Sequence, residues 1–319
     1  MVAGLYSTLN DEMIQTKKKI QSAMEYLMTY GWAILIIAVV LTVLFSLGIT
    51  NPLFFAPKAT AGGCQVLRPN GPGTTSFISL EGGGLCKEIP ESVAYLTDVQ
   101  QYYIIANILG EGSLPSGTTS LSIFAWIKIP SSDNIPWQRV VSYGTESCTG
   151  ESAGLEINGN GVTGSVAYDS ECGPSAWSQD INVNDNNWHF IGFSMPNGGN
   201  SATVTLYFDG VAVPHAGTNP GITDVRPEYI ILGGGPVPGA EQSINGEIAN
   251  IQIYNTTINA ASVKALYREG IGGAPIDLQN LVGWWPLNGN ANDYSGNNND
   301  GIATNVIWSG TWWQDYTQP

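Results

Sequence analysis

The longest apolar stretch of the chain lies near its N-terminus and predicts a long helix. Residues Tyr26 to Ile49 include no charged side chain. As an α-helix these residues would be about 36 Å long, and the hydrocarbon core of a bilayer is roughly 30 Å thick. Pro52 cannot continue a helix and disfavours helical backbone in Asn51. We therefore expect a long apolar helix over residues 21–50.

Beyond this helix the pattern changes to short apolar runs separated by turn residues. Residues 51–92 begin with a segment rich in glycine, proline and alanine, which indicates a neck or linker. From residue 93 to 319, strand-like runs follow one another, namely Tyr102–Ala106, Leu121–Ile129, Val140–Tyr143, Gly154–Ile157, Gly164–Tyr168, Trp188–Ser194, Thr203–Phe208, Tyr229–Leu232 and Ile248–Tyr254. Asp209-Gly210 is a hairpin signal.

One helix is expected among these strands. Asn259 is its N-cap, Ala260–Arg268 forms its body, and Gly270 follows its end. Many short strands with a single helix predict an all-β sandwich head over residues 93–319.

Charge indicates how the chain is oriented and excludes one class of partner. Three lysines, Lys17, Lys18 and Lys19, precede the apolar segment and outweigh Asp11 and Glu12 by one charge. Since the whole chain carries −15, the residues after position 20 carry −16. Lysines before a membrane segment place the N-terminus in the cytoplasm and the large domain outside. We do not expect nucleic acid as a partner, because a chain this acidic repels the phosphate backbone.

Cysteine usage agrees with export. The four cysteines lack the Cys-x-x-Cys spacing of a zinc site; they are Cys64, Cys86, Cys148 and Cys172. Two disulfides are expected in an exported domain, and three connectivities exist. We favour Cys64–Cys86 and Cys148–Cys172, because each closes a loop of about twenty residues, which is worth roughly 3 kcal/mol in the loop-entropy model. Four buried free thiols are the alternative.

The N-terminal segment contains an acid that an ordinary anchor does not need. It reads KKKIQSAMEYL before the long apolar run, with Glu25 in the first turn of the predicted helix. This resembles the class III signal peptide of archaeal type IV pilins. The resemblance implies a leader of residues 1–20, cut between Ile20 and Gln21 by a prepilin-peptidase-like protease. The new ammonium of Gln21 would then pair with Glu25 during filament assembly. An uncut N-terminal anchor is the alternative.

The head resembles laminin-G-like, concanavalin A-like jelly rolls. The resemblance rests on six segments in one domain, which are SLSIFAWIKI (120–129), NNWHFIGFSM (186–195), VTLYFDGV (204–211), INGEIANIQIYN (244–255), ASVKALY (261–267) and LVGWWPLNGNANDYSGNNNDG (281–301). In that family a segment like the last one opens the domain, whereas here it closes it. We interpret this as a circular permutation. The alternative is that residues 281–319 complete the sheet of a neighbouring subunit.

Candidate chemistry is sparse. No catalytic residue is proposed, because the chain lacks the carboxylate run of related glycosidases. The oxygen-rich loop of residues 290–300 is the candidate calcium site, with Asp293, Asp300 and Asn292 as ligands. The resemblance implies Glu247 as a further ligand. A plain turn cluster is the alternative.

Two further features concern sugars. Ten tryptophans exceed the needs of one core and suit either glycan stacking or subunit interfaces. Asn255-Thr256-Thr257 is an N-glycosylation sequon that makes Asn255 a surface candidate.

Together these features predict a pilin, the structural subunit of an extracellular filament on the cell surface. Before assembly the subunit would be embedded in the membrane. It would then interact with the prepilin peptidase and the pilus assembly machinery and form a homopolymer. The main alternative is a membrane-anchored or pilus-displayed lectin that binds glycans. A glycan-hydrolysing enzyme is a more distant third.

Overall fold

The computed structural model describes two compact units, Met1–Phe55 and Ala56–Pro319. The described residues are 28, 30–44, 58–59, 61–82, 86, 89–97, 104–106, 114–132, 137–145, 151–159, 164–169, 174–179, 181–217, 223–234 and 243–319. Ile20, Gln21 and Glu25, the predicted processing and assembly residues, lie outside this set, as do Cys148 and Cys172.

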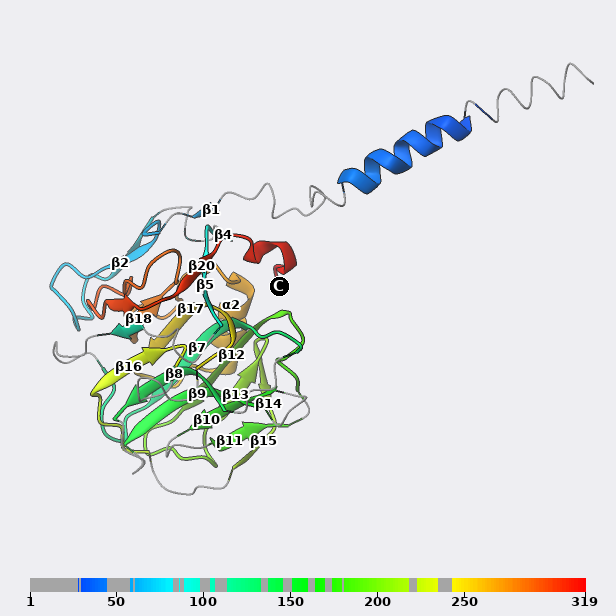
Figure 1. Ribbon diagram of the computed structural model, residues 1–319. Helices are drawn as coiled ribbons and strands as arrows, with labels where there is room; N and C mark the ends of the chain where they lie inside the picture. Colours follow the sequence, from blue (N-terminus) through cyan, green and yellow to red (C-terminus); the bar gives the residue numbers. More distant parts are fainter. Residues whose placement is uncertain are drawn as a thin grey trace, which may run out of the picture. The chain divides into compact units, whose positions relative to one another are not determined.

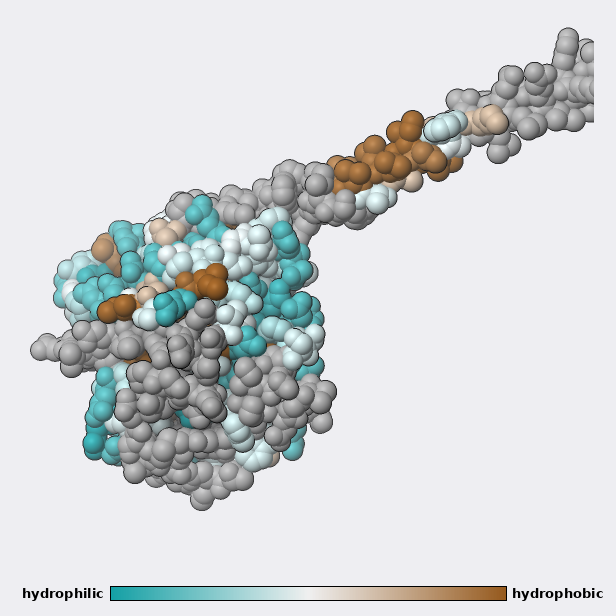
Figure 2. Space-filling model, viewed as in Figure 1, coloured by the Kyte–Doolittle hydropathy of each residue, from teal (hydrophilic) through white to brown (hydrophobic). Residues whose placement is uncertain are grey.

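The first unit contains the described part of the predicted apolar helix, at residues 28 and 30–44 (Figure 1). Its large apolar side chains, from Met28 to Val43, are 46–67% exposed. The surface along this helix is accordingly apolar (Figure 2). The described helix is shorter than the predicted 21–50, and the other residues of that range lie outside the described set. Among the described residues, no helix combines the length and the hydropathy of a membrane span.

The second unit is a sandwich of two antiparallel sheets (Figure 1). In spatial order, the described strands of the first sheet are β15 (His215–Gly217), β11 (Pro174–Ser178), β10 (Gly164–Asp169), β9 (Ser152–Gly159), β8 (Gln138–Gly144), β16 (Tyr229–Leu232), β6 (Ile104–Ala106) and β19 (Gly301–Ala303). Those of the second sheet are β14 (Val211–Val213), β13 (Thr205–Phe208), β12 (Trp188–Met195), β7 (Leu121–Lys128), β17 (Gly246–Tyr254), β5 (Val93–Leu96) and β20 (Ile307–Ser309), and β18 (Leu281–Trp285) pairs with β17. The predicted all-β sandwich is confirmed.

Most predicted strands are confirmed with boundaries shifted by a few residues. The hairpin between β13 and β14 turns at Asp209 and Gly210, with φ of 47° and 77°. Two consecutive positive φ values characterise the type I′ turn that matches the twist of a hairpin. Six strands of the sandwich were not predicted, namely β5, β11, β15, β18, β19 and β20.

The core lies between the two sheets and is built by alternation along the strands. On β7, Ile123, Ala125 and Ile127 point into it and are fully buried. They meet residues of the first sheet such as Leu155 and Ile157. Successive side chains of a strand point to opposite faces, so the residues between them lie on the outer face of the second sheet.

That outer face is covered by an aromatic layer. The helix α2 (Ala260–Glu269) places Tyr267 flat against Trp126 of β7, with ring centroids 5.7 Å apart. The 3-10 helix η3 (Trp312–Asp315) and the residue after it add Trp312 and Tyr316, and Tyr316 meets Trp126 edge-on. Both faces of β7 are therefore buried, which explains its almost continuous apolar sequence.

The local signals of α2 are those predicted. The Asn259 side chain accepts the Ser262 N–H at 3.0 Å and caps the first turn. Gly270 ends the helix with φ of 79°, and its N–H donates to the Tyr267 carbonyl. The predicted helix is confirmed and extends one residue further, to Glu269.

The segment predicted as a neck is largely part of the head. Two short strands, β1 (Lys58–Ala59) and β4 (Ile89–Pro90), pair in parallel, and β2 (Gln65–Leu67) and β3 (Ser79–Glu81) form a hairpin. The predicted disulfide Cys64–Cys86 is present and joins these pieces.

One buried arginine holds the hairpin on the C-terminal part of the head. Arg68 donates to the carbonyls of Ser295 at 2.9 Å, Leu278 at 2.8 Å and Leu281 at 2.9 Å, and also to that of Thr74. Such a set of bonds uses most of the five guanidinium donors.

The C-terminal segment 281–319 completes both sheets of its own chain. β18 pairs with β17, β19 pairs with β6, and β20 pairs with β5. This is the pairing that a permuted sandwich requires within one subunit.

Candidate functional site

A row of cross-strand partners on the second sheet brings polar side chains together. In the register, Lys128 of β7 lies opposite Glu247 of β17, which in turn lies opposite Tyr95 of β5. Directly opposite residues of neighbouring strands point to the same face. Since Trp126 lies two positions before Lys128, this row continues the outer face that carries the aromatic layer.

Lys128 is held between two carboxylates. Its Nζ lies 2.8 Å from Oδ2 of Asp315 and 3.6 Å from Oε2 of Glu247. The side chains of Lys128 and Glu247 are 11% and 12% exposed, whereas that of Asp315 is 59% exposed. The pair of Lys128 with Glu247 is thus partly withdrawn from water, where ionic contacts are screened less than at the surface.

An open hollow of about 300 Å³ lies beside this cluster. Its polar lining comes from five parts of the chain, with Tyr95, Lys128, Asn186, Glu247, Ser309 and Thr311 contributing. Small-molecule sites generally have volumes of about 300–1,000 Å³. The hollow is therefore large enough for one or two sugar rings, and it is the candidate binding site of the head.

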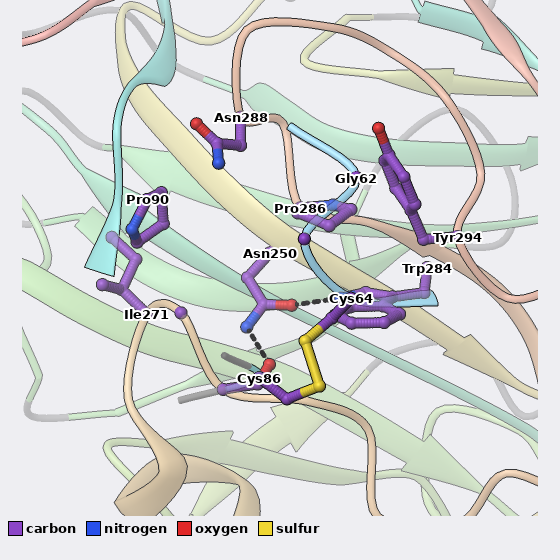
Figure 3. A pocket seen from close by; sticks show the side chains of 13 residues that line it. Gly62, Cys64, Cys86, Pro90, Asn250, Ile271, Trp284, Pro286, Asn288 and Tyr294 are labelled. Carbon is purple, nitrogen blue, oxygen red and sulfur yellow. Dashed lines mark hydrogen bonds between the residues drawn. A yellow bond between two sulfur atoms is a disulfide. The ribbon is translucent and has the colours of Figure 1, made fainter. Parts of the chain in front are cut away.

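A second, smaller pocket lies beside the disulfide (Figure 3). Asn250 is at its centre, in a bulge of β17 where its φ is 46°. Its Oδ1 accepts from Trp284 Nε1 at 2.8 Å and from Gln252 Nε2 at 3.0 Å, and its Nδ2 donates to the Gly273 carbonyl at 2.8 Å. The cavity of about 40 Å³ can hold a few waters but no sugar ring. The Asn250 amide thus connects β17 with Trp284 of β18 and with the loop at Gly273.

The predicted calcium loop uses its acid for hydrogen bonding. Oδ1 of Asp293 accepts the N–H groups of Trp284 and Ser295, each at 2.9 Å. Its Oδ2 accepts from Ser295 Oγ at 2.8 Å and from the Asn299 N–H at 3.0 Å. Burial raises the pKa of Asp293, and these hydrogen bonds lower it only in part, so the pKa lies above its ordinary value.

The other predicted ligands are placed around this acid or elsewhere. Asp300 accepts the Asp293 N–H at 2.8 Å, and Asn292 donates its own N–H to Asn290. Glu247 lies in the hollow with Lys128. Within the described part of the chain, no three His, Cys, Asp or Glu side chains form a group that could hold a metal ion. The calcium site stays a prediction.

Asn255, the predicted glycosylation residue, is exposed directly after β17. Its backbone N–H donates to the Asn280 carbonyl at 2.9 Å.

His189 is buried, with Nδ1 at 2.9 Å from Asp209 and Nε2 at 3.1 Å from Asp185. Burial alone would lower the pKa of His189, but the hydrogen bonds and charges of the two aspartates reverse this and raise it. Both ring nitrogens are engaged, which supports a structural role.

Sequence reasoning named Glu247 but missed Lys128, Tyr95 and Asp315. Lys128 had a visible signal, because it is the charged residue at the end of the otherwise apolar run SLSIFAWIK. Tyr95 had none, since its position beside Glu247 depends on the register of two strands about 150 residues apart.

The two packed sheets and the helix on their outer face define a concanavalin A-like sandwich. The family model of the concanavalin A-like lectin/glucanases superfamily, in its Laminin_G_3 form, matches residues 100–264, more than half of the chain. The chain therefore belongs to this superfamily. The match ends before the segment 281–319, which carries β18, β19 and β20.

Several solved structures resemble part of this chain at low identity and with TM-scores below 0.5. A putative carbohydrate binding protein from Bacteroides ovatus is 12% identical with a TM-score of 0.49, and the match covers 69% of this chain but only 60% of that one. The heptameric SAP-like pentraxin of Limulus polyphemus is 12% identical with a TM-score of 0.42, covering 67% and 96%. Domains LG4-5 of the mouse laminin α1 chain are 15% identical with a TM-score of 0.37, covering 53% and 43%. No curated protein sequence matches the chain.

Proposed function

We propose that the head is a carbohydrate-binding module that acts outside the cell. The observation that carries this proposal is the open polar hollow beside Tyr95, Lys128 and Glu247 in a domain of the lectin and glucanase superfamily. Sugars are bound by hydrogen bonds from hydroxyls to polar side chains and by contact of their apolar ring faces with aromatic rings. The hollow offers both kinds of contact.

The disulfide supports a location outside the cytoplasm. Cys64 and Cys86 are joined in a part of the chain that packs on the head, and such bonds persist in oxidising compartments. The lysines before the apolar segment favour the same orientation.

The unit Ala56–Pro319 is suited to the test, because both sheets, the core and this disulfide lie within it. Purified with the disulfide formed, it is applied to a broad glycan array, and hits are measured by calorimetry. We expect dissociation constants in the micromolar to millimolar range and weaker binding by Tyr95→Ala. Glu228→Gln, a change at an exposed carboxylate outside the hollow, serves as the matched control. If no glycan binds the unit or the full chain, the proposal is wrong.

A second function, that of a filament subunit of the type IV pilin kind, is favoured by the N-terminal helix. Its described residues expose apolar side chains on all sides, and a helix of this kind must be buried in lipid or against other helices. The proposal is that the leader is removed before Gln21, that Glu25 pairs with the new N-terminus, and that the helices pack in a filament core. The head would then display its hollow on the filament.

Electron microscopy of shed material, combined with N-terminal sequencing of its subunit, tests this second function. Filaments whose subunit starts at Gln21 support it. A subunit that starts at Met1 and never leaves the membrane contradicts it and leaves a membrane-anchored binding module.

A further inference from the structure

We infer that the hollow selects neutral sugars and discriminates against acidic glycans. This inference rests on the proposed carbohydrate-binding function and specifies its ligand class. It follows from the balance of donors and acceptors around the hollow, from its charge, and from the position of its aromatic ring.

The hollow needs a ligand that donates hydrogen bonds. A carboxylate accepts only, and one oxygen of Glu247, Oε2, makes an ionic contact of 3.6 Å with Lys128, longer than a hydrogen bond. For its other oxygen, Oε1, the described part of the chain provides no hydrogen-bond donor. Lys128 has three protons, and two carboxylates already face it. A sugar hydroxyl can donate to the free carboxylate oxygen, and such a bond to an ionised acceptor is stronger than a neutral one.

The charge around the hollow disfavours an acidic ligand. Among the described residues that line it, Lys128 is the one cation, and its charge is compensated by Glu247 and Asp315. The three groups together carry −1. The chain beyond residue 20 carries −16, so its long-range field also repels anions. A carboxylate or sulfate on the ligand would meet Glu247 without a cation left to pair with.

Tyr95 contributes an aromatic side chain to the lining of the hollow. Tyr95 is half-buried between Glu247 of β17 and Ile307 of β20, its partners in the register. Ser309 and Thr311 follow on the same edge and line the hollow with hydroxyls that can donate or accept. This combination suits a ring with one apolar face and several equatorial hydroxyls.

The experiment uses the full chain in detergent micelles and an array of matched glycans. Each neutral oligosaccharide is printed beside its sialylated and its sulfated form, and the affinities of the best sets are then measured in solution at about 50 mM and about 500 mM salt. We expect the neutral form to bind at least about tenfold more tightly than its acidic forms, a factor that corresponds to about 1.4 kcal/mol. The ratio should shrink at high salt, because the charges are then screened.

Two variants assign this selectivity to the hollow. Thr311 is exposed and lines the hollow, and T311K adds a cation there without replacing any residue of the Lys128 cluster. T311K should strengthen binding of the acidic forms and reduce the ratio several-fold. Tyr95→Ala should lose binding of the neutral form, whereas Tyr95→Phe, which keeps the ring, should retain it. Glu228→Gln should behave as the unmodified chain.

The outcomes separate this inference from the function on which it rests. Preference for neutral glycans that T311K reduces and Tyr95→Ala abolishes supports both. Equal or tighter binding of acidic glycans overturns the ligand class and leaves carbohydrate binding standing. Neutral binding that Tyr95→Ala leaves unchanged, or a neutral-to-acidic ratio that T311K leaves unchanged, places the ligand elsewhere and overturns the inference. Absence of any glycan binding overturns both.

Discussion

Replacement of Asp293 by asparagine tests whether the loop of residues 290–300 is a hydrogen-bonded support. The substitution keeps the size and shape of the side chain. It converts Oδ2, which accepts from Ser295 Oγ and from the Asn299 N–H, into an amide that donates. The bonds on Oδ1 can persist.

The expected loss of stability follows from these contacts. The Ser295 hydroxyl can rotate and accept from the new amide, but the Asn299 N–H cannot, so two buried donors face each other. An unsatisfied buried donor costs about 1–3 kcal/mol, and the charge-assisted bonds to Oδ2 are lost as well. Against this, the raised pKa of Asp293 shows that burial of its charge is itself unfavourable, so the neutral variant recovers part of the loss. We expect a net destabilisation of about 2–3 kcal/mol, which lowers Tm by roughly 4–12 °C in a domain of this size.

Thermal unfolding of Ala56–Pro319, followed by far-UV circular dichroism at neutral pH, measures this shift. Asp224→Asn is the matched control, because the Asp224 side chain is exposed. A variant Asp293→Asn whose Tm lies within 1 °C of the unmodified unit would refute the assigned role of this carboxylate.

Three further results are expected. The pKa of His189 is raised above 6.5 in the folded head, so the stabilisation by its protonated form is present below pH 6.5 and is lost as the pH rises through the folded pKa. The free energy of unfolding should decline over this pH range. Denaturant titrations at several pH values measure this decline, and His189→Gln should lack it. Arg68→Lys should cost about 2–4 kcal/mol in chemical denaturation, since an ammonium cannot reach the separate carbonyls that the guanidinium contacts, and an equal stability would contradict this. If the predicted calcium site exists, added calcium should raise Tm relative to chelator, and equal melting temperatures would exclude it.

The fold was largely predictable because its main signals are local. The apolar run of β7 and the capping residues Asn259 and Gly270 act within a few positions of the elements they define. The short strands β5, β11, β15, β18, β19 and β20 were missed. They contain only three to five residues, and β11 starts at Pro174 while β15 ends at Gly217, residues that disfavour strands in isolation.

The candidate site was less predictable because it depends on the register of neighbouring strands. It also depends on which carboxylate oxygens already accept hydrogen bonds from the protein. Glu247 was named from the sequence as a calcium ligand, but its place between Lys128 and Tyr95 became visible only with the register of β7, β17 and β5. A carboxylate that supports a loop and one that binds calcium look alike in sequence, since both occur in loops rich in Asn, Asp and Gly. The sequence did not indicate that backbone N–H groups from Trp284, Ser295 and Asn299 donate to the Asp293 carboxylate.

The closure of both sheets by the last forty residues has a consequence for biogenesis. β5 finds its partner β20 more than 200 positions later, so the head has contacts of very long sequence separation and should fold slowly. A chain emerging N-terminus first cannot finish either sheet until residues 301–309 have been synthesised and released. Until then two strand edges remain open to other chains, a state prone to aggregation. Premature termination or proteolytic trimming within residues 281–309 would therefore leave both sheets without their last strands.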